Sequence, residues 1–281
     1  MSLRHALRVR RWVNRAVFLF SAFAGLTGLV ALVWILTVIL LRGLPAINGS
    51  FFTELPSPPG IPGGGLANAI VGTLMITALA TVIGVTVGIF AGIYLAEFGR
   101  TNLFGVSVRF CSDILMSAPS IVIGIFVYTL VVVRTGSFSG YSGALALAII
   151  MLPVVTRTTE EMLKLVPDDL REAALALGAP YWKMTFDVVL RGAGSGIITG
   201  VMLAVARVSG ETAPLLFTAL NSPYWSHSLN EPMANLTVTI FNYAMSPYED
   251  WQTMAWGGAL LITFGVLLFT VSARFILGRR K

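Results

Sequence analysis

The sequence of 281 residues has little charge and almost no cysteine. Only 11% of its residues are charged and 56% are hydrophobic, whereas about a quarter of a typical soluble domain is charged. The mean hydropathy is +0.82. This composition excludes a soluble globular domain. Cys111 is the single cysteine, so an internal disulfide is excluded as well.

Several catalytic motifs are also missing. The sequence has no GxxxxGK[ST] loop that would bind nucleotide phosphates, no HExxH zinc motif, and no aspartate within its apolar stretches. His5 and His227 are the two histidines, and neither has metal-ligand spacing to other residues. We therefore expect no metal, no cofactor and no enzyme activity in this chain, and the sequence disfavours an intramembrane protease.

Long apolar stretches dominate the sequence instead. Five windows without a charged residue are each long enough for a membrane helix of about 20 residues: 16–41, 55–96, 114–133, 135–156 and 252–273. A sixth stretch, 192–225, is interrupted only by Arg207 and Glu211. The sequence therefore predicts an all-α, polytopic membrane protein with six transmembrane helices.

The basic residues are distributed unequally between the two sides of these spans. Arg42 and Arg134 are alone on one side. The other side holds Arg4, Arg8, Arg10, Arg11, Arg15, Arg100, Arg109, Arg157, Lys164, Arg171, Lys183, Arg191, Arg274, Arg279, Arg280 and Lys281. By the positive-inside rule, both termini are expected in the cytoplasm. The net charge of +6 then reflects topology and attraction to anionic membrane lipid, not nucleic-acid binding.

Proline and glycine divide the chain. The segment LPSPPGIPGGGLAN cannot form a helix interior, so we expect residues 1–65 to hold a first span and an external loop. A five-helix core follows at 66–275, and 276–281 is a basic tail. Within the core, Gly84, Gly88 and Gly92 share four-residue spacing with a second series, Gly192, Gly196 and Gly200. Both series predict close helix packing, in the core or against another subunit. A short interfacial helix is expected within 233–244.

Arg207 and Glu211 are the most unusual residues of the sequence. Ionised side chains at hydrocarbon depth cost several kcal/mol and by default mark a functional site. Their four-residue spacing places both on one helix face. Arg207 lies about 22 Å along a helix from Gly192, deep in the fifth span. Gly210 and Pro214 bracket Glu211 and predict a helix break there, with a new helix N-terminus near Pro214. A buried ion pair that only fixes helix packing is the alternative.

The polar segment 157–191 between the fourth and fifth spans is the second informative feature. Leu163, Val166, Leu170, Ala173, Ala174 and Leu177 fall on one helical face, with a break at Val166-Pro167. Asp168 and Asp169 suit the N-terminus of the helix after this proline, through capping and the helix dipole. Gly178 suits its C-terminal cap. Such a helix could lie in the lipid headgroups or dock on a partner.

Within this segment, Glu172, Ala173, Ala174 and Gly178 form an EAA-x3-G motif, which resembles the EAA loop of ABC-importer permeases. The stretches EAALALGAPYWKM, SGIITG, ARVSGETAPLLFTAL and NLTVTIFNYAMSP resemble the phosphate-specific members of that family. The resemblance covers about 66–274 and implies a type I importer core. It also implies that Asp168, Glu172, Ala173, Ala174 and Gly178 form a coupling helix that docks on an ATPase.

The resemblance further implies partners. These are a sister permease, PstC, two PstB ATPase subunits that bind ATP and magnesium, and a periplasmic phosphate-binding protein, PstS. The chain would form half of a phosphate path across the bacterial inner membrane. A permease for another oxyanion and a phosphate-sensing subunit without transport are the alternatives.

Phosphate crossing hydrocarbon needs donors and positive charge in place of its water. Arg207 suits this need because guanidinium binds phosphate oxygens with two parallel hydrogen bonds. Glu211 would balance that charge so that phosphate is released. Thr212 would add a hydroxyl donor, and Pro214 would start the new helix.

Overall fold

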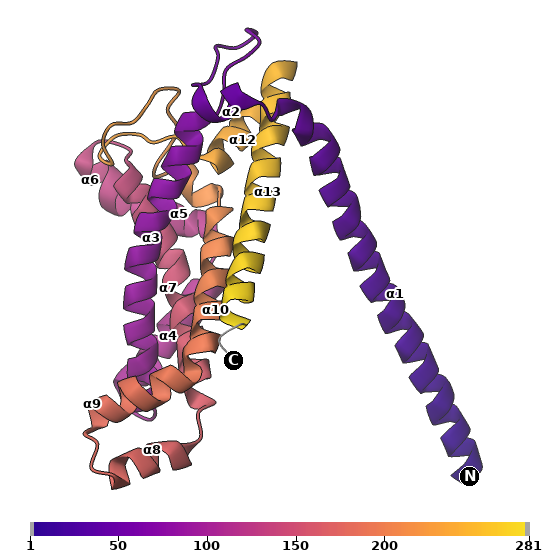
Figure 1. Cartoon of the computed structure of the whole chain (residues 1–281), viewed down its shortest axis with the longest axis vertical. Coiled ribbons are helices and arrows are strands. Elements are labelled where there is room, and N and C mark those ends of the chain that lie inside the picture. The colour runs from indigo at the N-terminus through magenta and orange to yellow at the C-terminus, as the bar shows by residue number, and fades with distance from the viewer. Residues whose placement is uncertain (1–2, 279–281) are drawn as a thin grey trace.

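The computed structural model describes residues 3–278 and consists mainly of helices joined by loops (Figure 1). Within these residues the one extended pairing is an antiparallel bridge between Pro56 and Gly64. The all-α prediction is confirmed. Of the predicted basic tail, residues 279–281 lie outside the described range. The long helices are α1 (Leu3–Gly43), α3 (Ala67–Ile93), α7 (Gly140–Lys164), α10 (Leu190–Ser209) and α13 (Glu249–Gly278).

Five helical stretches of the described chain are long and apolar enough to cross a membrane. They are Arg10–Ala46, Ala67–Phe98, Gly140–Lys164, Tyr181–Ser209 and Glu249–Ser272. A sixth candidate is a bent pair, α4 (Leu103–Ser117) and the helix from Ser120 to Thr135, whose axes meet at 107°. The second helix of this pair comprises α5 (Ser120–Val127), a π-helical turn and α6 (Val133–Thr135).

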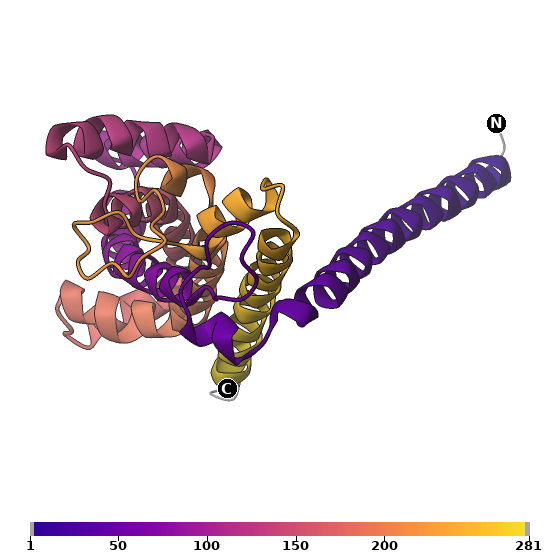
Figure 2. The same cartoon turned by 90° about the horizontal axis from the view of Figure 1, so that it is seen from above.

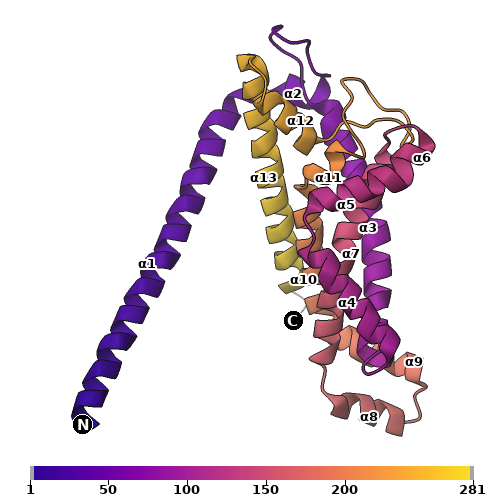
Figure 3. The same cartoon turned by 180° about the vertical axis from the view of Figure 1, so that it is seen from behind.

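This bend corrects the prediction of a single straight span at 114–133. Ala118 has extended dihedrals, φ −69° and ψ 135°, and Pro119 is the N-cap of the next helix. Proline disfavours the helical conformation of the residue before it, so the chain turns there. The apolar run conceals the turn because both sides of it are hydrophobic. Figure 3 shows α4 and α5 running in different directions from this turn.

Helix α7 is the centre of the bundle, and both glycine series pack on it. A Cβ placed on Gly88 of α3 would lie 2.8 Å from Cβ of Val155. From the other side, Gly196 of α10 faces the side chain of Met162. The prediction of close packing is confirmed, and both contacts lie within the chain. The main hydrophobic core surrounds this arrangement and includes Leu147 and Met151.

Helix α1 stands away from the bundle (Figures 1 and 2). It meets α13 near its C-terminal end, where Gly43 packs on Trp256 and Leu260. Arg42 lies over the Trp256 ring, 5.2 Å from its centroid. None of the apolar window of α1 is buried in the described chain. A span with this much exposed apolar surface suits contact with lipid or another subunit.

The predicted interfacial helix is present as α12 (Leu236–Ala244), capped by the Asn235 side chain, which accepts a hydrogen bond from the Val238 N–H. It packs on α13, and Tyr243 stacks on Trp251 with ring centroids 4.3 Å apart. Burial raises the pKa of Tyr243 to about 12. This end of the molecule also holds α2 (Gly49–Thr53), opposite the end that holds α8 (Asp168–Ala176) and α9 (Tyr181–Lys183) (Figure 1).

Candidate functional site

The predicted helix break after Arg207 is confirmed. Helix α10 ends at Ser209, and Gly210 caps it. The N–H of Gly210 donates to the Arg207 carbonyl at 3.2 Å, and the N–H of Glu211 donates to the Val208 carbonyl at 3.1 Å. These two amides close the helix end and therefore do not point toward a ligand.

The helix that follows the break is short. Helix α11 is a single turn, Ala213–Leu216, with Thr212 at its N-cap and no side-chain capping bond. A helix dipole grows with the number of aligned peptide units, so one turn offers an anion little positive charge. The expected helix N-terminus near Pro214 is therefore a weak one. Any attraction of an anion at this break depends mainly on the Arg207 side chain.

Arg207 and Glu211 face each other loosely. The Arg207 Nε and Glu211 Oε1 atoms are 3.9 Å apart, which is an ion pair but too long for a hydrogen bond. The Arg207 side chain is 57% exposed and the Glu211 side chain 18% exposed. The Glu211 carbonyl accepts a hydrogen bond from the Thr237 hydroxyl of α12 at 2.9 Å. Glu211 is thus fixed in the fold, while the guanidinium is available to a ligand or a neighbouring chain.

Pro214 anchors the break against the bent pair of helices. It is buried, and a Cβ placed on Gly124 of α5 would lie 2.6 Å from the Pro214 Cα. The Pro214 carbonyl accepts a hydrogen bond from the Thr218 hydroxyl at 2.8 Å. The helix after the break in α10 therefore packs against the helix after the bend between α4 and α5.

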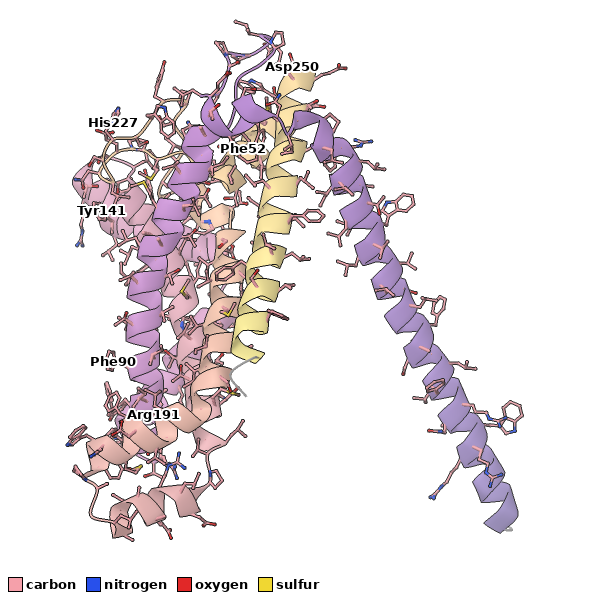
Figure 4. The ribbon with its side chains drawn as sticks, in the orientation of Figure 1. Phe52, Phe90, Tyr141, Arg191, His227 and Asp250 are labelled. Carbon is pink, nitrogen blue, oxygen red and sulfur yellow. The ribbon has the colours of Figure 1, made fainter. Side chains whose placement is uncertain are left out.

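Arg207 belongs to an exposed line along α10 that sequence analysis did not identify. The line consists of residues at every fourth position, all exposed in this chain: Arg191, Ser195, Thr199, Leu203 and Arg207. Ser195 and Thr199 are polar positions on an otherwise apolar span. Their positions, twelve and eight residues before Arg207, repeat the four-residue helical spacing and were a signal in the sequence that could have found them. Figure 4 shows Arg191 at the α8 end of the bundle and His227 at the opposite end.

The helix predicted after Pro167 is present as α8. Its C-terminus follows the prediction, since Gly178 has φ +81°. The N–H of Gly178 donates to the Leu175 carbonyl, and the N–H of Ala179 donates to the Ala174 carbonyl. These two bonds form a Schellman motif. The capping prediction for the other end is wrong, because Pro167 occupies the N-cap and no side chain caps it. Asp168 and Asp169 lie in the first turn, where the dipole still favours them.

The single apolar face predicted across this segment is also wrong. Leu163 and Val166 are buried in a cluster at the end of α7, whereas Leu170 and Leu177 are 50% and 90% exposed. The turn at Pro167 changes the direction of the helix axis, so the two halves do not share a face.

Most of the EAA residues lie on the open surface of α8. Glu172, Ala173 and Gly178 are exposed, while Ala174 is half-buried against the cluster at the end of α7. Together with Leu170 and Leu177, these side chains give α8 a partly apolar outer surface. Figure 1 shows α8 lying across the end of the bundle. This surface could receive another protein.

A buried arginine, Arg171, holds α8 in place. From the sequence, this residue is predicted only to help set the membrane topology. The Arg171 Nη2 donates to Glu97 Oε1 at 2.9 Å and to the Leu163 carbonyl at 2.8 Å. The Arg171 Nη1 donates to the Val166 carbonyl and to Asp168 at 3.1 Å. Glu97 belongs to the π-helical turn Tyr94–Phe98 that ends α3. The residues next to Arg171 and Glu97 in the sequence do not indicate that these two side chains pair.

Residues 84–280 match the family described as the binding-protein-dependent transport system inner membrane component. The chain therefore belongs to this family, a class of membrane transport component and not an enzyme. Its fold is that of the solved structure titled "Inward facing conformations of the MetNI methionine ABC transporter". The TM-score is 0.65 at 19% identity, over 77% of this chain and 96% of that one. The predicted type I importer core is confirmed.

Within this family, the chain is similar to proteins named phosphate transport system permease protein PstA. It is 53% identical to that of Yersinia pestis over 97% of this chain and 92% of that protein. It is 52% identical to that of Xylella fastidiosa over 99% of this chain and 97% of that protein. The Mycobacterium tuberculosis protein PstA 1 is 37% identical over 98% and 92% of the two chains. The resemblance to phosphate-specific permeases is confirmed.

Proposed function

We propose that this chain is a permease subunit of an ATP-driven phosphate importer and forms half of its path. The observation that carries the proposal is Arg207, a guanidinium 57% exposed on a membrane helix of a chain so similar to phosphate permeases. An exposed cation on an apolar span requires a partner, since hydrocarbon does not solvate it. A passing phosphate or an acidic group of the sister permease, PstC, would supply that partner.

The line of exposed residues on α10 extends the proposed path. Ser195 would offer a hydroxyl group between Arg207 and the α8 end of the span. The Thr199 hydroxyl donates to the Ser195 carbonyl at 2.8 Å and would turn from that carbonyl to the phosphate. Glu211 and Thr212 lie at the other end, beside Arg207. We infer that Glu211 weakens the hold of Arg207 on phosphate enough for release, because conduction needs sites that bind moderately.

Helix α8 is the proposed contact with the ATPase subunits, PstB. Its exposed Glu172 and Ala173 support this role. Gly178, which has a positive φ and is exposed, ends the helix and leaves its C-terminal end accessible. In this proposal α8 and both termini lie in the cytoplasm of a bacterial cell, and the binding protein, PstS, approaches the α12 end. ATP hydrolysis in PstB would then alternate the side to which the path opens.

Replacing Arg207 by Gln tests the path. The four-protein complex would be reconstituted in liposomes, and uptake of radioactive phosphate would be measured with ATP inside. We expect normal assembly and ATPase stimulation, with phosphate uptake lost. Unchanged uptake would refute a substrate role for Arg207 and favour the alternative of a pair that only fixes packing.

The matched control is Arg134→Gln. It removes the same charge from α6, outside the exposed line of α10. Arg134 is exposed, so its loss should change little. Parallel uptake of sulfate and molybdate would test the second candidate, a permease for another oxyanion.

A further inference from the structure

A small polar pocket lies beside α8 and takes no part in the proposed path. Its volume is about 250 Å³, and its lining is Arg100, Arg109, Lys164 and Asp168. The three cations come from three places in the fold. Arg100 follows the turn that ends α3, Arg109 lies on α4, and Lys164 is the last residue of α7. The pocket is therefore formed where these elements meet the start of α8.

A fully buried carboxylate holds two of these cations in position. Glu160 accepts hydrogen bonds from Arg109 Nε at 2.7 Å and from Lys164 Nζ. Arg109 also donates to the Leu95 carbonyl at 2.9 Å. Arg100 donates from Nε to the Ala96 carbonyl at 2.8 Å. Side chains fixed in this way lose little freedom when a ligand arrives, which favours binding.

The cations retain donors for such a ligand. An ammonium group has three N–H donors, and Glu160 takes one from Lys164. Arg100 reaches Asp168 only at 3.4 Å, and the two side chains are 45% and 66% exposed. An exposed ion pair of this length contributes little, so another acceptor can displace it. The lining holds three positive charges against the one of Asp168, with Glu160 beneath them.

We propose that this pocket binds a phosphate group, which is either inorganic phosphate or the headgroup of an anionic phospholipid. Its oxygens accept hydrogen bonds from Arg100 and Lys164, and Arg109 adds positive charge from the side. The bound phosphate displaces Asp168 from Arg100. Because Asp168 is the first residue of α8, occupancy removes one of the ion pairs that tie α8 to the rest of the chain, while Arg171 and Glu97 remain paired.

The binding of a phosphate group in this pocket does not depend on the proposed function. Its effect on transport does. If α8 couples to an ATPase, a phosphate group in this pocket reduces the coupling. Inorganic phosphate accumulating on the α8 side then slows further uptake, and a lipid headgroup there makes uptake depend on membrane composition.

The test uses the permease–ATPase complex without its phosphate-binding protein, with Arg207→Gln in every sample to remove the proposed path site. The complex would be placed in nanodiscs of phosphatidylcholine, and the binding of radioactive phosphate would be measured by equilibrium dialysis. We expect Arg100→Gln and Lys164→Gln each to weaken the binding of one phosphate by about tenfold, because each removes a charge-assisted donor. Lys183→Gln, an exposed cation of α9 outside the pocket, should leave it unchanged.

A second arm distinguishes the lipid from free phosphate. Native mass spectrometry would count the phosphatidylglycerol molecules that stay bound after transfer from mixed nanodiscs. Retention of one lipid by the control, and its loss in Arg100→Gln, assigns the pocket to a headgroup. Arg100→Gln leaves both Glu160 bonds intact, so it remains informative if Lys164→Gln fails to fold. The proposal is overturned if Arg100→Gln matches Lys183→Gln in both arms.

Discussion

Arg171 and Glu97 form a buried ion pair, with Nη2 and Oε1 2.9 Å apart and side chains 8% and 1% exposed. The pair joins the helix that carries the EAA residues to the end of α3. The Tyr181 hydroxyl adds a 3.3 Å hydrogen bond to the Glu97 carbonyl, so α9 is attached at the same point. We therefore expect a movement of α8 to reach α3 and the segment that leads into α10.

Arg171→Met should destabilise the chain strongly. It leaves Glu97 buried without its cation, and breaking one side of a buried pair costs about 3–5 kcal/mol. We expect a clear fall in the melting temperature of the purified protein in detergent, measured by intrinsic fluorescence. Arg191→Gln breaks an exposed pair and should leave the melting temperature nearly unchanged. Equal effects of the two changes would contradict this assignment.

The reversed pair, Glu97→Arg with Arg171→Glu, should recover part of the lost stability. Recovery will be incomplete, because the Leu163 and Val166 carbonyls now accept hydrogen bonds from Arg171 and would be left without that donor. The melting temperature of the double variant should lie between those of Arg171→Met and the unaltered chain. Both variants lose the carbonyl bonds, so a double variant less stable than Arg171→Met would show that the reversed pair does not form.

Gly88→Leu should disrupt the packing of α3 on α7. Its new Cβ alone would lie 2.8 Å from Cβ of Val155, and overpacking of this kind costs about 1–3 kcal/mol. The matched control is Gly194→Leu on α10, where nothing lies within 4 Å of the added Cβ. Thermal unfolding in detergent compares the two. A lower melting temperature for Gly194→Leu than for Gly88→Leu would refute the packing described here.

Glu211→Gln should slow phosphate release. Without the carboxylate 3.9 Å away, Arg207 keeps its full attraction for the anion. An ion pair this loose contributes up to about 1 kcal/mol, so we expect kcat and KM for uptake to fall together by about two- to fivefold. Glu231→Gln, an exposed acid of the loop before α12, is the control. A rise in KM at unchanged kcat would mean that Glu211 helps to bind phosphate.

Ala173→Trp should uncouple the chain from its ATPase. Ala173 is exposed on α8, so the larger side chain costs the isolated chain little but obstructs a partner seated there. We expect an unchanged melting temperature, reduced co-purification of PstB and loss of ATP-driven uptake. Thr101→Trp, at an exposed loop position beyond α3, should co-purify normally. Full uptake by Ala173→Trp would remove α8 from the contact.

Sequence reasoning succeeded where the signal was local. Pro167 and Gly178 delimit α8 by their own backbone preferences, and Gly210 and Pro214 mark the break after α10 in the same way. The glycine series predicted close packing because a four-residue spacing exposes one backbone face. Such features need no knowledge of distant residues.

The failures involve tertiary contacts or uniform apolarity. Arg171 pairs with Glu97, which is 74 positions away. The sequence around each of these two residues does not indicate that they pair. The bend at Ala118–Pro119 is hidden because apolar residues continue on both sides of it. The contact of Pro214 with Gly124 of α5 joins two distant parts of the chain, which a sequence does not reveal.

The glycine contacts on both sides of α7 have a mechanical consequence. A larger residue at Gly88 or Gly196 would overlap Val155 or Met162, so α3 and α10 lie closer to α7 than any side chain at these positions would allow. We expect helices packed this closely to move as a single block. We expect conformational changes of this chain to occur around that block. They would take place at the contact between α10 and α13, at the bend between α4 and α5, or along the exposed line of α10.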